Sequence, residues 1–241
     1  MRTASDDTKK CRGPGDSSHG GGGGIYGRAI PAVRYGDAVA GTECPARSVR
    51  LFENDWLERL SRVHPAAPLL LWTPVIAWLL GGAIVREGPP LTIAIWLAAA
   101  GLLCWTLTEY LVHRFLFHLR PRSRAMQRLV FIVHGVHHEA PDDPARLLMP
   151  PAPAIAACSI LYGLFRAILG AVWVEPFFAF FLIGYLAYDY LHLAAHGRRP
   201  RTRIGRFLHR WHMLHHFATP DARWGVSSPM WDHVFRTAAS R

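Results

Sequence analysis

The sequence is poor in the residues that build disulfide-stabilised domains and cysteine-based metal modules. Four cysteines occur among 241 residues, and no two of them have CxxC spacing: Cys11, Cys44, Cys104 and Cys158. Two of them lie inside apolar runs, so we expect unpaired thiols and no disulfide framework. Lysine is almost absent beside arginine, which is typical of a GC-rich bacterial gene.

Acidic residues are also scarce. The chain has 17 Asp and Glu against 27 Lys and Arg, which gives a net charge of +10. In a soluble protein, such an excess would favour nucleic acid as a partner. Here the basic residues flank long apolar runs, so we expect a membrane that contains anionic lipid as the partner, and no nucleic acid.

The first 48 residues lack both an apolar period and the hydrophobic segment of a secretory signal peptide. They are rich in Gly, Ser and charge and include the run Gly20–Gly24. This composition predicts a disordered leader over residues 1–48. The remaining residues, 49–241, are predicted to form a membrane-embedded domain.

Long apolar segments dominate that second part. A helix needs roughly 20 apolar residues to cross a bilayer. The apolar stretch from 151 to about 195 is too long for one crossing, and Gly170 and Glu175-Pro176 near its middle favour a hairpin of two helices. We therefore expect four spans, at about 68–86, 91–113, 151–170 and 174–195.

Arginine is distributed unevenly around these spans. It is frequent after the second and the fourth span and rare on the opposite side. Because positively charged loops stay in the cytoplasm, both basic segments and the N-terminus are expected there. The sequence thus predicts a multi-pass protein of the bacterial cytoplasmic membrane, with its polar segments on the cytoplasmic side.

Ten of the fourteen histidines fall into four groups, which lie at the ends of the second and fourth spans or just after them. The groups are "HRFLFH" (His113, His118), "HGVHH" (His134, His137, His138), "HLAAH" (His192, His196) and "HMLHH" (His212, His215, His216). Ionisable residues in or beside a bilayer are costly and usually functional. This clustering indicates one functional site.

The spacing within the groups points to metal binding. Residues i, i+3 and i+4 lie on one side of a helix, so each HxxHH is expected to offer three imidazoles to one point. His113 and His118 are about 140° apart on an ideal helix, so they share a site only if the helix ends or bends between them, or else they reach different metals. The repeated HxxHH suggests a binuclear centre.

The donor type narrows the choice of metal. Neutral imidazole binds Zn, Cu, Fe and Ni. Ten imidazoles exceed the needs of one tetrahedral structural zinc. Soluble di-iron bundles use Glu-x-x-His, which this sequence lacks. The sequence therefore predicts a histidine-rich metal site that differs from the carboxylate-rich soluble kind.

Other residues receive weaker predictions. Asp189, one turn before His192, could orient an imidazole or be a plain polar residue at a helix end. His209 has Met213 four residues on, so we interpret it as a supporting or surface residue and not as a ligand. Trp224 and Trp231 are interpreted as anchors at the membrane interface.

The order HxxxxH, HxxHH, HxxxH, HxxHH between paired spans resembles the fatty acid hydroxylase superfamily. The segments "HGVHHEAPDDPARLLMPP", "YDYLHLAAH" and "GVSSPMWDHVFRT" are most similar to its fatty acid 2-hydroxylase branch. The resemblance covers residues 51 to 237. It implies an all-α integral membrane protein, with four transmembrane helices and a cytosolic helical cap that holds a dimetal site.

The resemblance also implies a function. The ten histidines named above would be the metal ligands, with iron in the active enzyme and zinc possible in its place. The reaction would be O2-dependent hydroxylation at C2 of a long acyl chain, free or lipid-linked. "HGGGGG" (19–24) does not match the haem-binding HPGG motif, so external electrons are expected from a separate cytochrome b5-like or ferredoxin-like donor.

Two alternatives stay open. A sterol or carotenoid hydroxylase or desaturase of the same superfamily would share the histidine pattern, although the segment after HGVHH favours acyl hydroxylation. A membrane metal-binding or transport protein would use similar ligands without oxidation. Transporters place their ligands at the bilayer midplane within broken helices, whereas these histidines lie at span ends.

Overall fold

The computed structural model describes residues 48–86, 88–197 and 200–239. Apart from Ser48, the expected leader lies outside the described residues, as do Cys11 and Cys44. The leader and the boundary at residue 48 therefore stay predictions. Cys104 and Cys158, which the structure describes, are both unpaired thiols, as expected.

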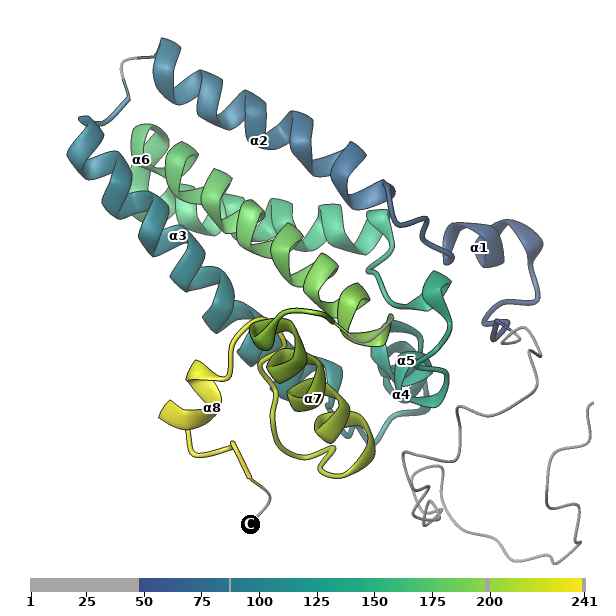
Figure 1. Cartoon of the computed structure of the whole chain (residues 1–241). Helices are drawn as coiled ribbons and strands as arrows, with labels where there is room; N and C mark the ends of the chain where they lie inside the picture. Colours follow the sequence, from purple (N-terminus) through teal and green to yellow (C-terminus); the bar gives the residue numbers. More distant parts are fainter. Residues whose placement is uncertain (1–47, 87, 198–199, 240–241) are drawn as a thin grey trace, which may run out of the picture. The chain divides into compact units, whose positions relative to one another are not determined.

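The described residues form helices and connecting segments, with no strand among them. In chain order the helices are α1 (Asp55–Leu60), α2 (Ala67–Val85), α3 (Leu91–Leu111), η2 (Val112–Phe117), α4 (Arg124–Val130), η3 (Phe131–Gly135), α5 (Val136–Glu139), η4 (Pro144–Arg146), α6 (Pro151–His196), α7 (Arg203–Phe217) and α8 (Met230–Val234). The segments η2 and η3 are π-helices, and η4 is a single 3-10 turn. Figure 1 shows their arrangement.

Three of these helices are long and apolar enough to cross a membrane: α2, α3 with its continuation η2, and α6. Proline precedes or opens each one, where its missing N–H costs no helical hydrogen bond. Large apolar side chains such as Leu70, Ile84 and Trp96 are exposed on α2 and α3. Such a surface suits contact with lipid.

The third and fourth expected spans form one element, α6, which reverses direction at Gly170. This residue has φ 79° and ψ 170°, a conformation that is essentially restricted to glycine. The rings of Tyr162 and Phe178 come within 5.2 Å, which a straight helix would forbid. Glu175 and Pro176, also proposed as part of the turn, lie inside the helix that follows it. We call residues 151–169 the first arm and residues 171–196 the second arm (Figure 1).

The second arm lies at the centre of the packing. Val174, Phe181 and Leu182 are fully buried within it. A Cβ on Gly101 of α3 would lie 2.2 Å from the Phe177 carbonyl oxygen, so α3 and the second arm approach closely only because this position is glycine. The second arm therefore fixes the position of its own C-terminal histidines against α3.

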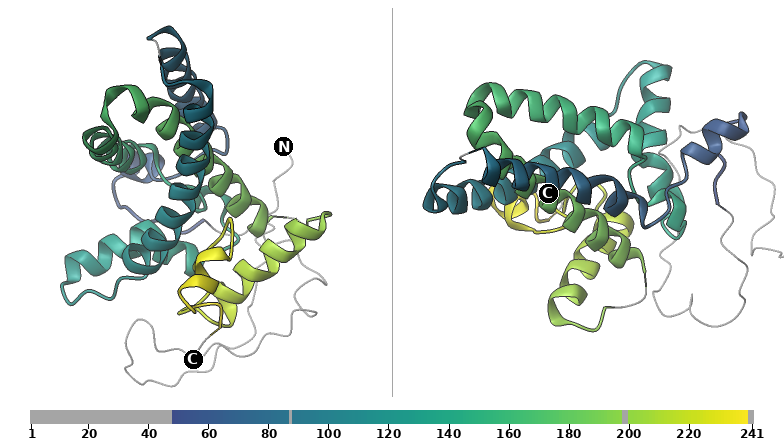
Figure 2. Two further views of the ribbon diagram at one scale, coloured as in Figure 1. Left: turned by 90° about the vertical axis from the view of Figure 1, so that its left-hand side faces the viewer. Right: turned by 90° about the horizontal axis from the view of Figure 1, so that it is seen from above.

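Most of the shorter helices, but not α1, gather where α3 and the second arm end (Figure 1). We call η3, α4, α5, α7 and α8 the cap. Seen from two further directions, α7 and α8 lie side by side (Figure 2), and the rings of Trp211 and His233 are 5.8 Å apart. The segment after α5 is held to α1 by Arg146, which is buried and pairs with Glu58 at 2.5 Å.

Candidate metal centre

The ten histidines of the four sequence groups come together in the structure as two groups of five. Cluster A comprises His113, His118, His134, His138 and His215. Cluster B comprises His137, His192, His196, His212 and His216. In each cluster, one ring nitrogen per residue lies within 4.8 Å of the others. The prediction that these residues converge is confirmed.

The expectation that each HxxHH directs three imidazoles to one point is wrong. The outer pair of the first motif, His134 and His138, joins cluster A, whereas His137 joins cluster B. The second motif divides in the opposite sense: its outer pair joins cluster B and His215 joins cluster A. Positions i+3 and i+4 lie about 60° and 40° to opposite sides of position i, so one motif can serve two points.

His113 and His118 both belong to cluster A because the helix changes its form between them. The segment Val112–Phe117 is a π-helix, in which hydrogen bonds join residues five apart. Two residues five positions apart therefore come close to the same face. Of the possibilities left open by the sequence, a changed helix geometry is the one found.

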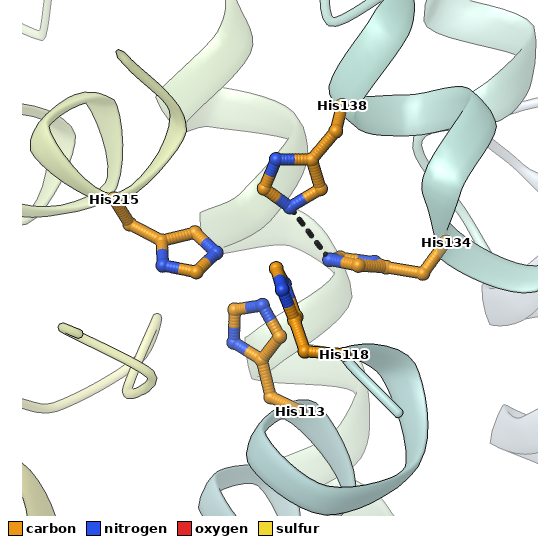
Figure 3. Close-up of side chains that lie close together, drawn as sticks. All are labelled: His113, His118, His134, His138 and His215. Carbon is orange, nitrogen blue, oxygen red and sulfur yellow. Dashed lines mark hydrogen bonds between the residues drawn. The ribbon is translucent and has the colours of Figure 1, made fainter. Parts of the chain in front are cut away.

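Side chains from three parts of the chain meet in cluster A. Figure 3 shows its five imidazoles pointing toward one another from η2 and its end, from η3 and α5, and from α7. The Nε2 atoms of His134 and His138 are 2.9 Å apart. The Nε2 atoms of His113, His118 and His215 are buried and have no hydrogen-bond partner among the described residues.

Cluster B is packed as closely. The Nε2 of His137 lies 2.9 Å from that of His216 and 3.0 Å from that of His192. The Nδ1 of His192 faces the Leu147 carbonyl oxygen at 3.1 Å and must carry the single proton of that neutral ring, so its Nε2 is a bare acceptor. Bare acceptors that converge repel one another unless a cation lies between them. Both clusters therefore fit metal ions.

Backbone carbonyls set the orientation of key imidazoles. His113 Nδ1 donates to the carbonyl of Trp224 at 2.5 Å, and His215 Nδ1 donates to that of Ala222 at 2.7 Å. A histidine that donates from one nitrogen presents the other to a metal in a fixed direction. The segment 222–228 thus supports cluster A from outside.

Two carboxylates that sequence reasoning missed hold this segment in place. Glu109 of α3 accepts from the backbone N–H groups of Val226 and Ser227, and also from the Ser227 hydroxyl. Asp232 of α8 accepts from the backbone N–H groups of Trp224 and Gly225, at 2.9 and 2.8 Å. Both carboxylates are buried. A glutamate inside an apolar span was the available signal, because such residues are rarely without a function.

The interpretation of Trp224 as a membrane anchor is wrong. Its side chain is 5% exposed, and its ring centroid lies 4.8 Å from that of His118 and 5.3 Å from that of His215. It therefore packs against cluster A and excludes water from it. Trp231 is partly buried and donates to the Thr106 hydroxyl of α3 at 3.0 Å.

Burial keeps the cluster imidazoles neutral. It is the main cause that lowers the pKa of His118 to about 3, of His138 to about 2 and of His215 to about 4. Burial, together with the neighbouring imidazoles, places the pKa of His134 and His137 well below the usual histidine value. Neutral imidazole is the form that binds metal, so these histidines can bind a metal ion at pH 7 without first losing a proton.

The two residues with weaker predictions lie beside the clusters. His209 is in neither cluster, and its Nδ1 donates to the Ala195 carbonyl at 2.7 Å, next to His196. Asp189 is buried one turn before His192, and its side chain interacts with that of Tyr185. The outward nitrogen of His192 donates to Leu147, so Asp189 is not its acceptor.

A narrow cavity opens against both clusters. It lies between α3, the two arms of α6 and residues 146–149, and its volume is about 110 Å³. Its wall includes His134 of cluster A, together with His137 and His192 of cluster B. Most of the remaining wall is apolar, with Asp189 among the few charged groups. The cavity suits a thin apolar chain whose reacting end meets the two clusters.

The comparisons with known proteins agree with this geometry. The profile of a family described as fatty acid hydroxylase matches residues 98–237. The fatty acid 2-hydroxylase of Rattus norvegicus is 34% identical over 214 residues, which cover 80% of this chain and 57% of the rat protein. The ceramide very long chain fatty acid hydroxylase of Saccharomyces cerevisiae is 35% identical over 193 residues, which cover 79% of this chain and 49% of the yeast protein.

Two further relatives match a larger share of their own length. A dihydroceramide fatty acyl 2-hydroxylase of Arabidopsis thaliana is 31% identical over 188 residues, which cover 78% of this chain and 79% of the plant protein. A solved structure described as full-length scs7p, with only the hydroxylase domain visible, matches with a TM-score of 0.72 at 34% identity. That match covers 77% of this chain and 70% of the solved chain.

The apolar helices and the paired clusters define a helical membrane protein with two adjoining histidine sites suited to metal ions. The chain belongs to the fatty acid hydroxylase family. The resemblance seen in the sequence is thereby confirmed, including its similarity to the 2-hydroxylases. The chain spans about half of the length of its rat and yeast relatives, at 57% and 49%.

Proposed function

We propose that this protein hydroxylates C2 of a long acyl chain, with O2 as the oxidant and electrons from a separate donor of the cytochrome b5 or ferredoxin type. The observation that supports this most strongly is the cavity, because its wall contains histidines of both clusters and otherwise suits an acyl tail. Relatives that are named as fatty acid and ceramide 2-hydroxylases support the same assignment.

The ten histidines would hold two metal ions, one in each cluster. Iron is the metal that we assign to the active enzyme, and zinc is a metal that the same imidazoles accept. The bound metals supply the O2 activation that no side chain can perform. The protein supplies ten neutral imidazoles, most of them buried, and a site from which Trp224 excludes water.

The cavity wall positions the substrate. Apolar side chains such as Val112, Leu148 and Leu161 would hold the tail. The buried side chain of Asp189, which also interacts with Tyr185, would accept a hydrogen bond from an amide N–H or a hydroxyl. Such a contact suits the amide head of a lipid-linked acyl group.

The narrowness of the cavity separates acyl chains from the other substrates considered. Pockets for drug-sized molecules have volumes of roughly 300–1,000 Å³. A volume of about 110 Å³ suits a single chain better than the fused rings of a sterol. The acyl hydroxylase assignment is therefore the one that we retain.

We also propose four membrane crossings, with α2, α3 and the two arms of α6 each crossing once. The turn at Gly170 supports the two arms as separate crossings. The arginines of the cap support its placement in the cytoplasm by the positive-inside rule. The membrane that we assign is the bacterial cytoplasmic membrane, with the metal centre on its inner side.

Expression of the wild-type protein and of His137→Ala in a host that lacks 2-hydroxy acyl lipids tests the proposal. His137 contacts two other imidazoles of cluster B, so we expect its loss to remove one metal ion and all 2-hydroxy product. Mass spectrometry of host lipids and metal analysis of purified protein give the two readouts. The matched control is His64→Ala, an exposed histidine outside both clusters.

Wild-type protein that binds metal and yields no 2-hydroxy acyl lipid would contradict the assignment. So would a His137→Ala variant that keeps the full yield of product.

A further inference from the structure

The cavity extends from the clusters into the helical bundle. Among its lining residues, Trp105 is the one on α3 farthest from His113, Leu161 is farthest along the first arm, and Tyr185 is farthest from His192 on the second arm. α3 and the two arms of α6 therefore contribute one residue each to the deepest part of the lining. We call these three residues the floor of the cavity.

The bundle beyond the floor is filled with aromatic rings. Phe181 lies one turn beyond Tyr185 and is fully buried. Its ring is 5.2 Å from that of Trp105 and 5.6 Å from that of Phe165. A tail that extends from the metal clusters meets the floor first and then these aromatic rings.

Helix geometry gives the depth of this cavity. Trp105 is eight residues from His113 and Tyr185 is seven from His192, which at 1.5 Å per residue places the floor roughly 10–12 Å below the clusters. With carbon–carbon bonds of about 1.5 Å, an extended tail advances roughly 1.3 Å per carbon, so about eight or nine carbons fit above the floor. A longer tail must displace or pass a floor residue.

Trp105 is the floor residue with the largest side chain. Its ring lies 5.0 Å from Tyr185 and 5.7 Å from Tyr188, both of which also line the cavity. A Cβ on Gly184 would approach its side chain to 2.8 Å, so the second arm leaves room for the indole only because that position is glycine. The buried indole Nε1 has no hydrogen-bond partner among the described residues, so no polar contact holds the ring in place.

We propose that Trp105 determines the acyl-chain length that this protein accepts, by closing the cavity below the metal clusters. The proposal rests on the acyl hydroxylase function proposed above. Removal of the indole joins the cavity to the space that the ring now fills, and long tails gain access to it.

The test compares Trp105→Ala with wild-type protein in a host that is fed deuterated C10 and C16 fatty acids, of which only the C10 tail fits above the floor. We expect the ratio of 2-hydroxylated C16 to 2-hydroxylated C10 to rise about tenfold, which is the size of effect that a few methylenes have in an apolar pocket. Mass spectrometry of the labelled lipids measures both products in the same extract. Trp105→Phe keeps an aromatic ring, is the safer variant for folding, and should give a smaller rise.

Trp72→Ala is the matched control. Trp72 of α2 is 5% exposed and packs on Tyr185 at 5.9 Å, but it does not line the cavity. Removal of the Trp72 indole loses about as much buried packing as removal of the Trp105 indole. It should leave the ratio of the two products unchanged. An unchanged ratio in Trp105→Ala or Trp105→Phe, or an equal rise in Trp72→Ala, would overturn the proposal. The absence of any 2-hydroxy product from the wild-type protein would instead contradict the proposed function.

Discussion

A difference of one position in the sequence decides which cluster a histidine joins. His137 and His138 are neighbours in the chain, yet they belong to different clusters, and the same holds for His215 and His216. The two HxxHH motifs divide in opposite senses, so each cluster receives a pair from one motif and a single imidazole from the other. Each motif therefore links the two sites and helps to fix the distance between them.

At the same scale, we expect Asp232→Asn to weaken metal binding in cluster A. Asp232 holds the backbone of Trp224, whose carbonyl orients His113. Loss of such a supporting hydrogen bond lowers metal affinity by roughly 10–100-fold. The metal retained per chain after dialysis against a graded series of chelator concentrations measures this effect.

Asp221→Asn is the control for that experiment. Asp221 pairs with Arg120 at 2.6 Å, and both side chains are exposed, so the pair contributes only about 0–1 kcal/mol. Equal metal retention in the two variants would show that the hydrogen bonds that Asp232 accepts from segment 222–228 do not support the site.

The ten histidines could be found from the sequence because their residue type and spacing are visible without any knowledge of the fold. Their division into two clusters could not, because it depends on where the two sites lie relative to each helix axis. Glu109 and Asp232 were missed for a related reason. Glu109 stands out as a glutamate inside an apolar span, but both residues act on the backbone of segment 222–228, and contacts to backbone leave no pattern in the sequence that would identify their role.

The elements differ from their expected form where the chain bends. The apolar pattern predicted α2 and α3 closely, because burial in lipid requires long apolar helices. It did not predict the π-helices η2 and η3, since one additional residue in a turn leaves the surrounding apolar residues unchanged. The hairpin in α6 was predicted, but the sequence alone could not separate Gly170 from Glu175-Pro176 as the site of the turn.

We expect Gly170→Ala to destabilise the protein by about 1–3 kcal/mol, because its φ of 79° and ψ of 170° suit only glycine. Gly163→Ala is the matched control. Gly163 lies in the first arm of α6 and has nothing within 4 Å of an added Cβ, so alanine there should stabilise the helix by about 0.5–1 kcal/mol. The thermal midpoints of the detergent-solubilised variants provide the comparison. A Gly170→Ala variant that melts at or above the midpoint of Gly163→Ala would contradict the assigned turn.

For the whole molecule, the packing explains why the site lies where two long helices end. The second arm of α6 is buried at the centre and carries His192 and His196 at its C-terminal end. The η2 segment extends α3 to the same level, and the cap closes over both with the remaining ligand candidates. The cavity continues from this level into the bundle, so an acyl chain could enter the site without leaving an apolar environment.

The incorporation of oxygen from O2 is the most direct test of the central proposal, which is that this protein, with metal ions held by clusters A and B, would hydroxylate C2 of an acyl chain. Cells that express the protein would be grown under ¹⁸O2, and their lipids would be examined by fragment-resolved mass spectrometry. Our account predicts one ¹⁸O atom at C2 of the acyl chain in wild-type cells and none in cells that express His137→Ala. A 2-hydroxy product that carries oxygen from water, or ¹⁸O-labelled lipid that persists in His137→Ala, would contradict it.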